Sequence, residues 1–349
     1  MEGFDFNRVR FRRAPETDAE PRSPMPAYIM KRLLEALVVL LCVAGIAFIL
    51  FQFIGDPVAQ MLPMDATPED RARLTQALGL DRPAWVQFAH FITNALAGDF
   101  GMSLRQAAPV ADLFAERLPA TIELALAALV IALALGIPAG ILAAVKPESV
   151  VSKLLMGGSV LGMSLPTFLI GILLILVFSV ELEWLPSFGR GEVSRIGWWT
   201  TGLLTADGWR HLILPATTLA IFQLALIVRL VRSEMMEVIR EDFIRFAKAR
   251  GLSARAVYLG HAFKNTLLPV ITITALQLGG LVAFSIVTET VFQWPGMGLL
   301  FLQSVQFADI PVLTAYLCLM ALLFVVINLS ADALCAVIDP RLRLARERG

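Results

Sequence analysis

Polar side chains interrupt several long apolar stretches of this 349-residue chain. Glu123 lies near the start of one stretch and Glu289 near the end of another, while Asn328 and Asp332 are one helical turn apart in the last. Ionisable groups inside a membrane are costly and usually face protein or water, so these residues could line a path for a polar solute. They could equally form hydrogen bonds between helices. We favour the second interpretation for Asn328 and Asp332, and both stay open for Glu289.

A short charged segment between two apolar stretches suggests a docking surface. Residues 240–250 predict a helix about 16 Å long, at about 1.5 Å per residue. Glu241 and Arg245 are four residues apart in the favourable order for an ion pair. Phe243, Ala247 and Gly251 fall on another face, which gives a narrow apolar strip between charged flanks.

The ends of this predicted helix are also marked. Gly251 is placed to end it in a left-handed conformation, and Ser253 can cap the helix that follows. The segment could be an amphipathic connector at the headgroup level. However, the loop carries acidic as well as basic residues, unlike a helix that lies on a membrane. A short helix held at both ends suits a groove on another protein.

Motifs typical of enzymes are absent, and the residues that could bind a metal are scattered along the chain. The chain has no Gly-x-x-x-x-Gly-Lys-Ser/Thr phosphate loop, and no His-Glu-x-x-His or Gly-x-Ser-x-Gly motif. The three histidines have no metal-ligand spacing, and the three cysteines all fall within apolar stretches. These observations argue against an enzyme.

Composition places these residues in a membrane protein. The chain is 57% hydrophobic and 17% charged, whereas a soluble domain carries about a quarter charged residues. Six apolar stretches approach or exceed the roughly 20 residues that a spanning helix needs. They are residues 33–54, 120–145, 154–180, 211–231, 266–290 and 312–337.

The basic residues predict the orientation of these spans. With the N-terminus in the cytosol, 21 of the 29 Lys and Arg residues fall on the cytosolic side and 8 outside. This asymmetry follows the positive-inside rule.

The segment after the first span is too long for a simple connector. Thr67 and the acidic residues after Pro68 predict a helix start, and Gly79 its end. Residues 83–97 predict a second helix closed by Gly98, and residues 110–117 a third. We therefore expect a small helical domain outside the membrane.

The charged segment resembles the EAA loop of bacterial ABC importer permeases. Ala247 corresponds to the second alanine of that motif, Gly251 to its glycine, and Leu268-Pro269 to its last element. Arg245-Phe246 departs from the first two positions, a variation found in the dipeptide/oligopeptide branch. The chain is similar to that branch across residues 28–343. Further motifs agree with it in order: residues 28–33, 55–57, 98–103, 118–121, 261–265, 289–296, 309–311, 328–332 and 339–341.

This resemblance implies an all-α polytopic fold of six transmembrane helices, like that of a type I importer permease. It divides the chain into a flexible cytosolic tail (1–28), a first span (29–54) and a small periplasmic domain (55–118). A permease core (119–337) with a coupling loop (232–264) and a second cytosolic tail (338–349) follow.

The resemblance also implies function and partners. The chain would form half of a heterodimeric pore in the bacterial inner membrane, importing di-/oligopeptides or a related solute. Its partners would be a second homologous permease, two cytosolic ABC ATPases, a periplasmic solute-binding protein and the lipid bilayer, with no nucleic acid. ATP and Mg²⁺ would bind the ATPases, so this chain needs no cofactor or metal of its own.

Two groups of candidate residues follow from the resemblance. Contact with the ATPase is expected from Glu241, Asp242, Phe243, Phe246, Ala247, Gly251 and Leu252. The translocation path or its gate is expected among Glu289, Trp294, Pro295, Asn328 and Asp332. For Trp294 and Pro295 we favour a structural turn. The alternative function is an ion-coupled secondary transporter that works without an ATPase; such proteins often contain paired broken helices, which we do not find here.

Overall fold

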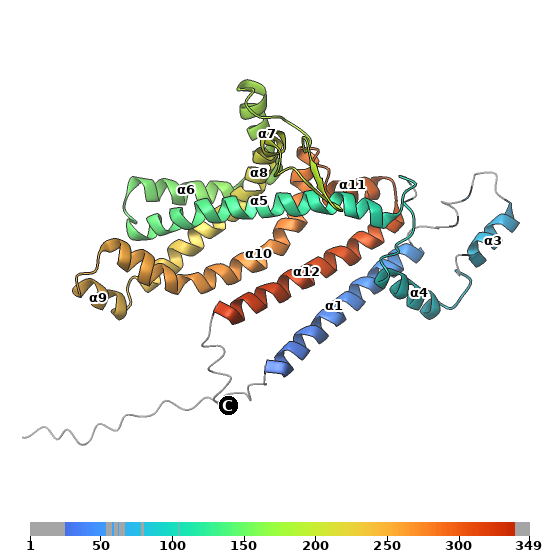
Figure 1. Ribbon diagram of the computed structural model, residues 1–349, viewed down its shortest axis with the longest axis horizontal. Coiled ribbons are helices and arrows are strands. Elements are labelled where there is room, and N and C mark those ends of the chain that lie inside the picture. Colours follow the sequence, from blue (N-terminus) through green and yellow to red (C-terminus); the bar gives the residue numbers. More distant parts are fainter. Residues whose placement is uncertain are drawn as a thin grey trace, which may run out of the picture.

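The computed structural model describes residues 25–53, 58, 62, 67–77, 80–103 and 105–338. Within them, long helices run side by side in one bundle (Figure 1). Five are long and apolar enough to cross a membrane, and a bent pair supplies a sixth span. The five are α1 (Met25–Phe53), α5 (Val110–Val145), α8 (Ala206–Val238), α10 (Lys264–Val291) and α12 (Ile310–Ile338). The predicted all-helical membrane fold is therefore confirmed.

The third apolar stretch does not form the single helix that its length suggests. It divides into α6 (Val150–Ser164) and α7 (Thr167–Ile175), which continues as the π-helix η2 (Leu176–Glu181). The two parts meet at an angle of 107°. Leu165 is extended, with φ −83° and ψ 133°, because the ring of Pro166 disfavours the helical conformation in the residue before it.

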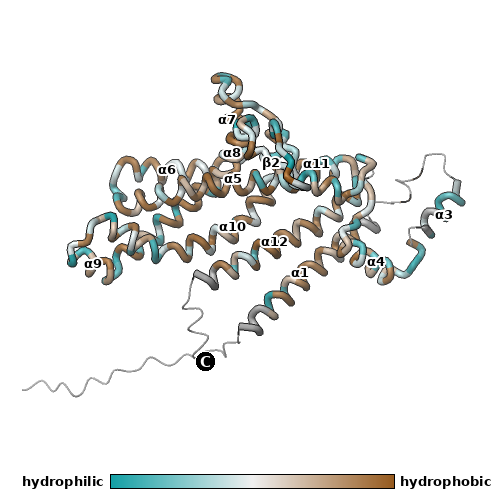
Figure 2. Tube along the Cα trace, viewed as in Figure 1, coloured by the Kyte–Doolittle hydropathy of each residue, from teal (hydrophilic) through white to brown (hydrophobic). Residues whose placement is uncertain are grey.

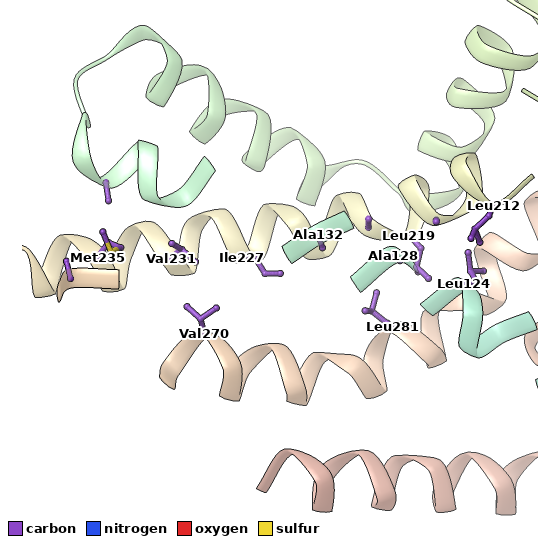
Figure 3. Close-up of a cluster of buried hydrophobic side chains, with 14 of the residues drawn as sticks. Leu124, Ala128, Ala132, Leu212, Leu219, Ile227, Val231, Met235, Val270 and Leu281 are labelled. Carbon is purple, nitrogen blue, oxygen red and sulfur yellow. The ribbon is translucent and has the colours of Figure 1, made fainter. Parts of the chain in front are cut away.

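Small residues let α5 and α8 pack closely along the bundle. A Cβ atom on Gly140 would lie 2.7 Å from the Cβ of Val231, and one on Gly136 would lie 2.9 Å from Ile227. The alanines of α5, including Ala128 and Ala132, are buried in the same cluster as Leu219 and Ile227 of α8 (Figure 3). Gly136 and Gly140 therefore serve the close packing of α5 against α8.

Shorter helices lie at the two ends of the apolar bundle, where α3 and α9 in particular carry many hydrophilic residues (Figure 2). At one end lies α9 (Asp242–Ala249), followed by the π-helix η3 (Ala256–Phe263). At the other lie α3 (Pro68–Ala77), α4 (Ala84–Leu96) and α11 (Met297–Gln306). A small antiparallel hairpin, β1 (Ser194–Ile196) and β2 (Trp199–Thr201), joins this end and adds a short sheet that the sequence did not predict.

The helices between α1 and α5 largely match the prediction. Thr67 caps α3: its hydroxyl accepts a hydrogen bond from the Asp70 amide, and Asp70 accepts one from the Thr67 amide. The Thr67 hydroxyl also donates to the Asp70 carboxylate at 2.7 Å, and this bond, together with the one from the Thr67 amide, lowers the pKa of the Asp70 carboxyl below its ordinary value. Gly98, just after α4, has a φ of +75°.

The third predicted outer helix, residues 110–117, is wrong as a separate element. It forms the first turns of α5, which runs without a break through Pro119. Pro119 lacks an N–H but leaves the helix continuous on both sides. Other predictions lie outside the described residues: most of the N-terminal tail, the C-terminal tail after Ile338, the 55–57 and 339–341 motifs, and Gly79 as a helix end. The predicted N-terminal tail (1–28) is too long, because α1 already begins at Met25.

Candidate functional site

Helix α9 is held against the bundle by one side only. Ile244 is fully buried and Ala247 is 7% exposed, and both pack in the cluster that contains Met235 of α8 and Val257 of η3. Phe243 and Phe246 face outward, with exposed fractions of 45% and 65%. The helix therefore uses its aliphatic side chains as an anchor and presents its aromatic side chains to solvent.

The end of α9 is fixed by its backbone. Gly251 has a φ of +77°, and its amide donates to the Lys248 carbonyl at 3.0 Å. The amide of Leu252 donates to the Ala247 carbonyl at 3.4 Å. These two bonds form a Schellman motif, in which glycine adopts the left-handed conformation at low cost. The Ser253 hydroxyl then accepts from the Ala256 amide, as predicted.

Two details of the sequence interpretation of this helix are wrong. Arg245 pairs with Asp242 at 3.2 Å rather than with Glu241, which precedes the helix in an extended conformation. The predicted strip of Phe243, Ala247 and Gly251 is not one exposed face, because Ala247 packs inward. In so short a helix the sequence does not reveal which of several apolar residues turns inward.

Of the predicted coupling residues, the structure exposes Glu241, Asp242, Phe243, Phe246, Gly251 and Leu252 together at one end of the bundle. The exposed Arg250 guanidinium lies 5.9 Å from the Phe246 ring. The surface is mixed, with aromatic rings between charges of both signs.

At the opposite end, Glu289 holds a turn together from inside. Its side chain is fully buried and accepts hydrogen bonds from the Thr121 hydroxyl at 2.6 Å, the Ser285 hydroxyl at 3.1 Å and the Leu299 amide at 2.9 Å. A Cβ on Gly296 would lie 2.5 Å from the Glu289 carboxylate. Glu289 is therefore surrounded by its own chain, which favours packing over a path for solute.

Trp294 belongs to the same turn. It is 1% exposed, and its indole N–H donates to the Ala120 carbonyl at 3.0 Å. The Met297 amide donates to the Thr121 hydroxyl at 2.8 Å, so Thr121 bridges the turn and Glu289. With Pro295 between these anchored residues, the geometry agrees with the structural turn that we favoured.

A second buried carboxylate, Glu123, forms an ion pair with Arg190. Their side chains are 2% and 7% exposed. Glu123 also accepts from the Gly202 amide at 3.0 Å, and Arg190 donates to the Thr200 carbonyl at 2.7 Å. The pair joins α5 to the β1–β2 hairpin. Sequence reasoning noted Glu123 but missed Arg190, because 67 residues separate them.

The side chains of Asn328 and Asp332 contact different partners. Asn328 donates to the Phe324 carbonyl within its own helix. Asp332 pairs with Arg32 of α1 at 3.1 Å. The interhelical contact that we favoured therefore exists for Asp332 and is absent for Asn328 among the described residues.

We expect Asp332→Asn to leave solute uptake within about twofold of the wild type. The two side chains of the ion pair are 42% and 33% exposed, and such accessible pairs contribute only about 0–1 kcal/mol. Uptake in membrane vesicles, normalised to the amount of inserted protein, measures this. Loss of uptake with normal insertion would instead make Asp332 part of the path. Glu35→Gln, which removes another carboxylate that pairs with Arg32, is the matched control.

No cluster of His, Cys, Asp or Glu that could hold a metal occurs among the described residues. A bundle of spanning helices, with a short exposed helix held between two of them, defines a polytopic membrane protein. Two family models match the chain. The model of the binding-protein-dependent transport system inner membrane component matches residues 136–344. The model of the N-terminal part of the membrane component of such systems matches residues 25–125. The chain belongs to this family of inner-membrane permeases.

Relatives and solved structures agree with this family. The glutathione transport system permease protein GsiC of Escherichia coli K12 is 40% identical over 317 residues, covering 90% of this chain and 98% of the relative. GsiC of Shigella dysenteriae serotype 1 matches equally. Two inward-facing structures of the MetNI methionine ABC transporter match with TM-scores of 0.50 and 0.52, at 17% and 16% identity. Both cover 65% of this chain and 96% of theirs, and they show the fold alone.

The chain is thus a multi-pass inner-membrane permease of a binding-protein-dependent ABC importer. It is not itself an enzyme, because ATP is bound and hydrolysed by a partner ATPase. This result favours the importer over the ion-coupled transporter that we considered as the alternative.

Proposed function

We propose that this permease forms half of a heterodimeric pore that imports di- or oligopeptides or a related small solute. The full assembly contains a second homologous permease, two cytosolic ATPases and a periplasmic solute-binding protein. Similarity to GsiC over nearly its whole length supports a peptide-like substrate, with glutathione among the candidates.

The exposed aromatic surface of α9 carries the proposal for coupling. Phe243, Phe246 and Leu252 are solvent-exposed although they are apolar, and aromatic residues anchored in a pocket dominate protein interfaces. Ile244 and Ala247 attach the helix to α8 and η3. Movement of α9 by an ATPase would therefore be transmitted to the bundle as rigid-body motion of packed helices.

The distribution of basic residues orients the chain. The α9 end and both termini lie in the cytosol under the positive-inside rule. The segment 55–118 then faces the periplasm as a small domain, followed by the permease core 119–337 with its coupling loop 232–264. The tails before Met25 and after Ile338 complete the chain. The exposed faces of α3 and α4 support a role of this outer domain in docking the binding protein.

Purification of the tagged chain from its native membrane in mild detergent tests the assembly. We expect mass spectrometry to identify a second six-span permease and one or two phosphate-loop ATPases.

Phe246→Ala should weaken ATPase binding about 30-fold, as expected for truncation of an interface aromatic that costs about 2 kcal/mol. Binding is measured by titration of the purified ATPase onto the permease pair in nanodiscs.

The control is Leu96→Ala on α4, which truncates a residue that is 84% exposed at the opposite end of the bundle. It should leave ATPase binding unchanged. Reproducible recovery of the chain without an ATPase would contradict the proposed assembly, and equal binding by the two variants would contradict docking through α9.

A further inference from the structure

A small cavity of about 140 Å³ opens where α7, α8 and α10 meet. Its polar lining comes from Thr167 of α7, Gln223 of α8 and Gln277 of α10. Phe222 and Phe284 also line it, with exposed fractions of 42% and 68%. None of these residues belongs to the turn around Glu289 or to the ion pair of Glu123.

The cavity lies halfway along the bundle. Gln223 is near the centre of Ala206–Val238, and Gln277 is near the centre of Lys264–Val291. Thr167 follows directly on the break between α6 and α7, where Pro166 starts α7 without a side-chain cap. Irregular backbone at membrane depth is tolerated where protein or a water-filled cavity surrounds it, and broken helices in transporters lie at midplane substrate sites.

Gln223 supplies the second observation. Its side chain is only 3% exposed, and its amide nitrogen has no hydrogen-bond partner among the described residues. A buried donor without a partner is destabilising, and a ligand that brings an acceptor removes that penalty. A carbonyl or carboxylate oxygen of a solute in this cavity would be such an acceptor.

A larger cavity nearby in the bundle has a different character. This cavity, of about 460 Å³ between α5, α10 and α12, is lined almost entirely by aliphatic side chains, with Thr274 and Ser330 as its polar members. Such a lining suits lipid chains or packing, whereas two amide side chains on adjacent helices suit a solute with alternating donors and acceptors.

We propose that Gln223 and Gln277 form a passage site for the backbone of the translocating peptide. Each primary amide both donates and accepts hydrogen bonds, so the pair can bind peptide groups without reading a particular side chain. Phe222 and Phe284 supply apolar contact for the side chains of the passing solute. This inference rests on the proposed import of peptides, and it assigns Gln223 and Gln277 to the translocation path.

The test uses the reconstituted complex of permeases, ATPases and binding protein, with radiolabelled glutathione and a radiolabelled tripeptide as probes. Gln223→Leu and Gln277→Leu should each reduce uptake per ATP hydrolysed about tenfold, while binding-protein-stimulated ATPase activity stays within about twofold. Gln223→Leu should also match or exceed the wild-type melting temperature, because it removes a buried amide that lacks a partner.

Thr274→Val is the matched control, since the Thr274 hydroxyl is also buried and without a partner among the described residues but lines the apolar cavity. It should preserve uptake. Wild-type uptake by the two glutamine variants would overturn the passage site. So would a parallel loss of melting temperature, ATPase activity and uptake, because that result indicates a structural role.

Water access provides a measurement that does not depend on peptide import. In a chain with Cys42, Cys318 and Cys335 replaced by alanine, Phe284→Cys should react with a negatively charged methanethiosulfonate. Leu322→Cys, at a position that is 47% exposed midway along α12, should not. Absence of peptide uptake by the wild type would refute the proposed substrate class alone. Failure of Phe284→Cys to react would refute an aqueous path at this cavity.

Discussion

Glu123→Ala is expected to destabilise the permease by about 3–5 kcal/mol, the cost of breaking a buried ion pair by removing one partner. The substitution leaves the Arg190 guanidinium buried without its carboxylate, and the Gly202 amide without its acceptor. Both groups connect the β1–β2 hairpin to α5. The hairpin should therefore separate from the bundle before the spans lose their own packing.

Thermal unfolding in detergent, followed by thiol labelling or limited proteolysis near the hairpin, measures this effect. The double variant Glu123→Leu with Arg190→Met should recover most of the lost stability, because replacing both members by apolar residues is often nearly neutral. Arg195→Met, which removes an exposed arginine of the same hairpin, is the control for general damage there. A wild-type melting temperature for Glu123→Ala would show that the ion pair of Glu123 and Arg190 contributes little to the stability of the permease.

The sequence predicted spans and helix ends well because these depend on local information. Hydrophobic length alone located the six apolar stretches, and Thr67, Gly98 and Gly251 mark helix ends through their own conformational preferences. The break in the third span is visible in Pro166, but its angle of 107° is not. That angle depends on how α7 packs against α8 and α10, which are distant in the sequence.

The roles of the polar residues required the tertiary structure. Glu289 is identified as a packing residue only once Thr121, 168 residues away, is seen to donate to it. Ser103 and Asp309 are joined in the same way, at 2.5 Å across 206 residues. The sequence analysis looked for the path among residues such as Glu289 and Asp332, whereas the cavity that we propose as a passage site is lined by uncharged Gln223 and Gln277. A glutamine inside an apolar stretch attracts little notice because it carries no charge.

Gly251→Val is expected to abolish most coupled transport while membrane insertion remains normal. The left-handed conformation costs an ordinary residue roughly 1–2 kcal/mol, and a β-branched side chain adapts to it worst. Outside the two neighbouring residues, no atom lies within 4 Å of a Cβ built at Gly251, so the penalty comes from the backbone and not from a clash. The chain must then leave α9 in another direction, at the expense of the bonds from the Gly251 and Leu252 amides.

The consequence for transport follows from where those bonds lead. They fix the exposed Leu252 and the start of η3 relative to Ala247, whose side chain anchors α9 to the bundle. A displaced helix end should reduce binding-protein-stimulated ATPase activity and uptake about tenfold, the effect of roughly 1.4 kcal/mol. Gly251→Asn should retain more activity, since asparagine tolerates the left-handed conformation. Gly260→Ala, at a helical glycine in η3 with similar free space, should retain nearly all of it. Full uptake by Gly251→Val would mean that the direction in which the chain leaves α9 has no part in coupling.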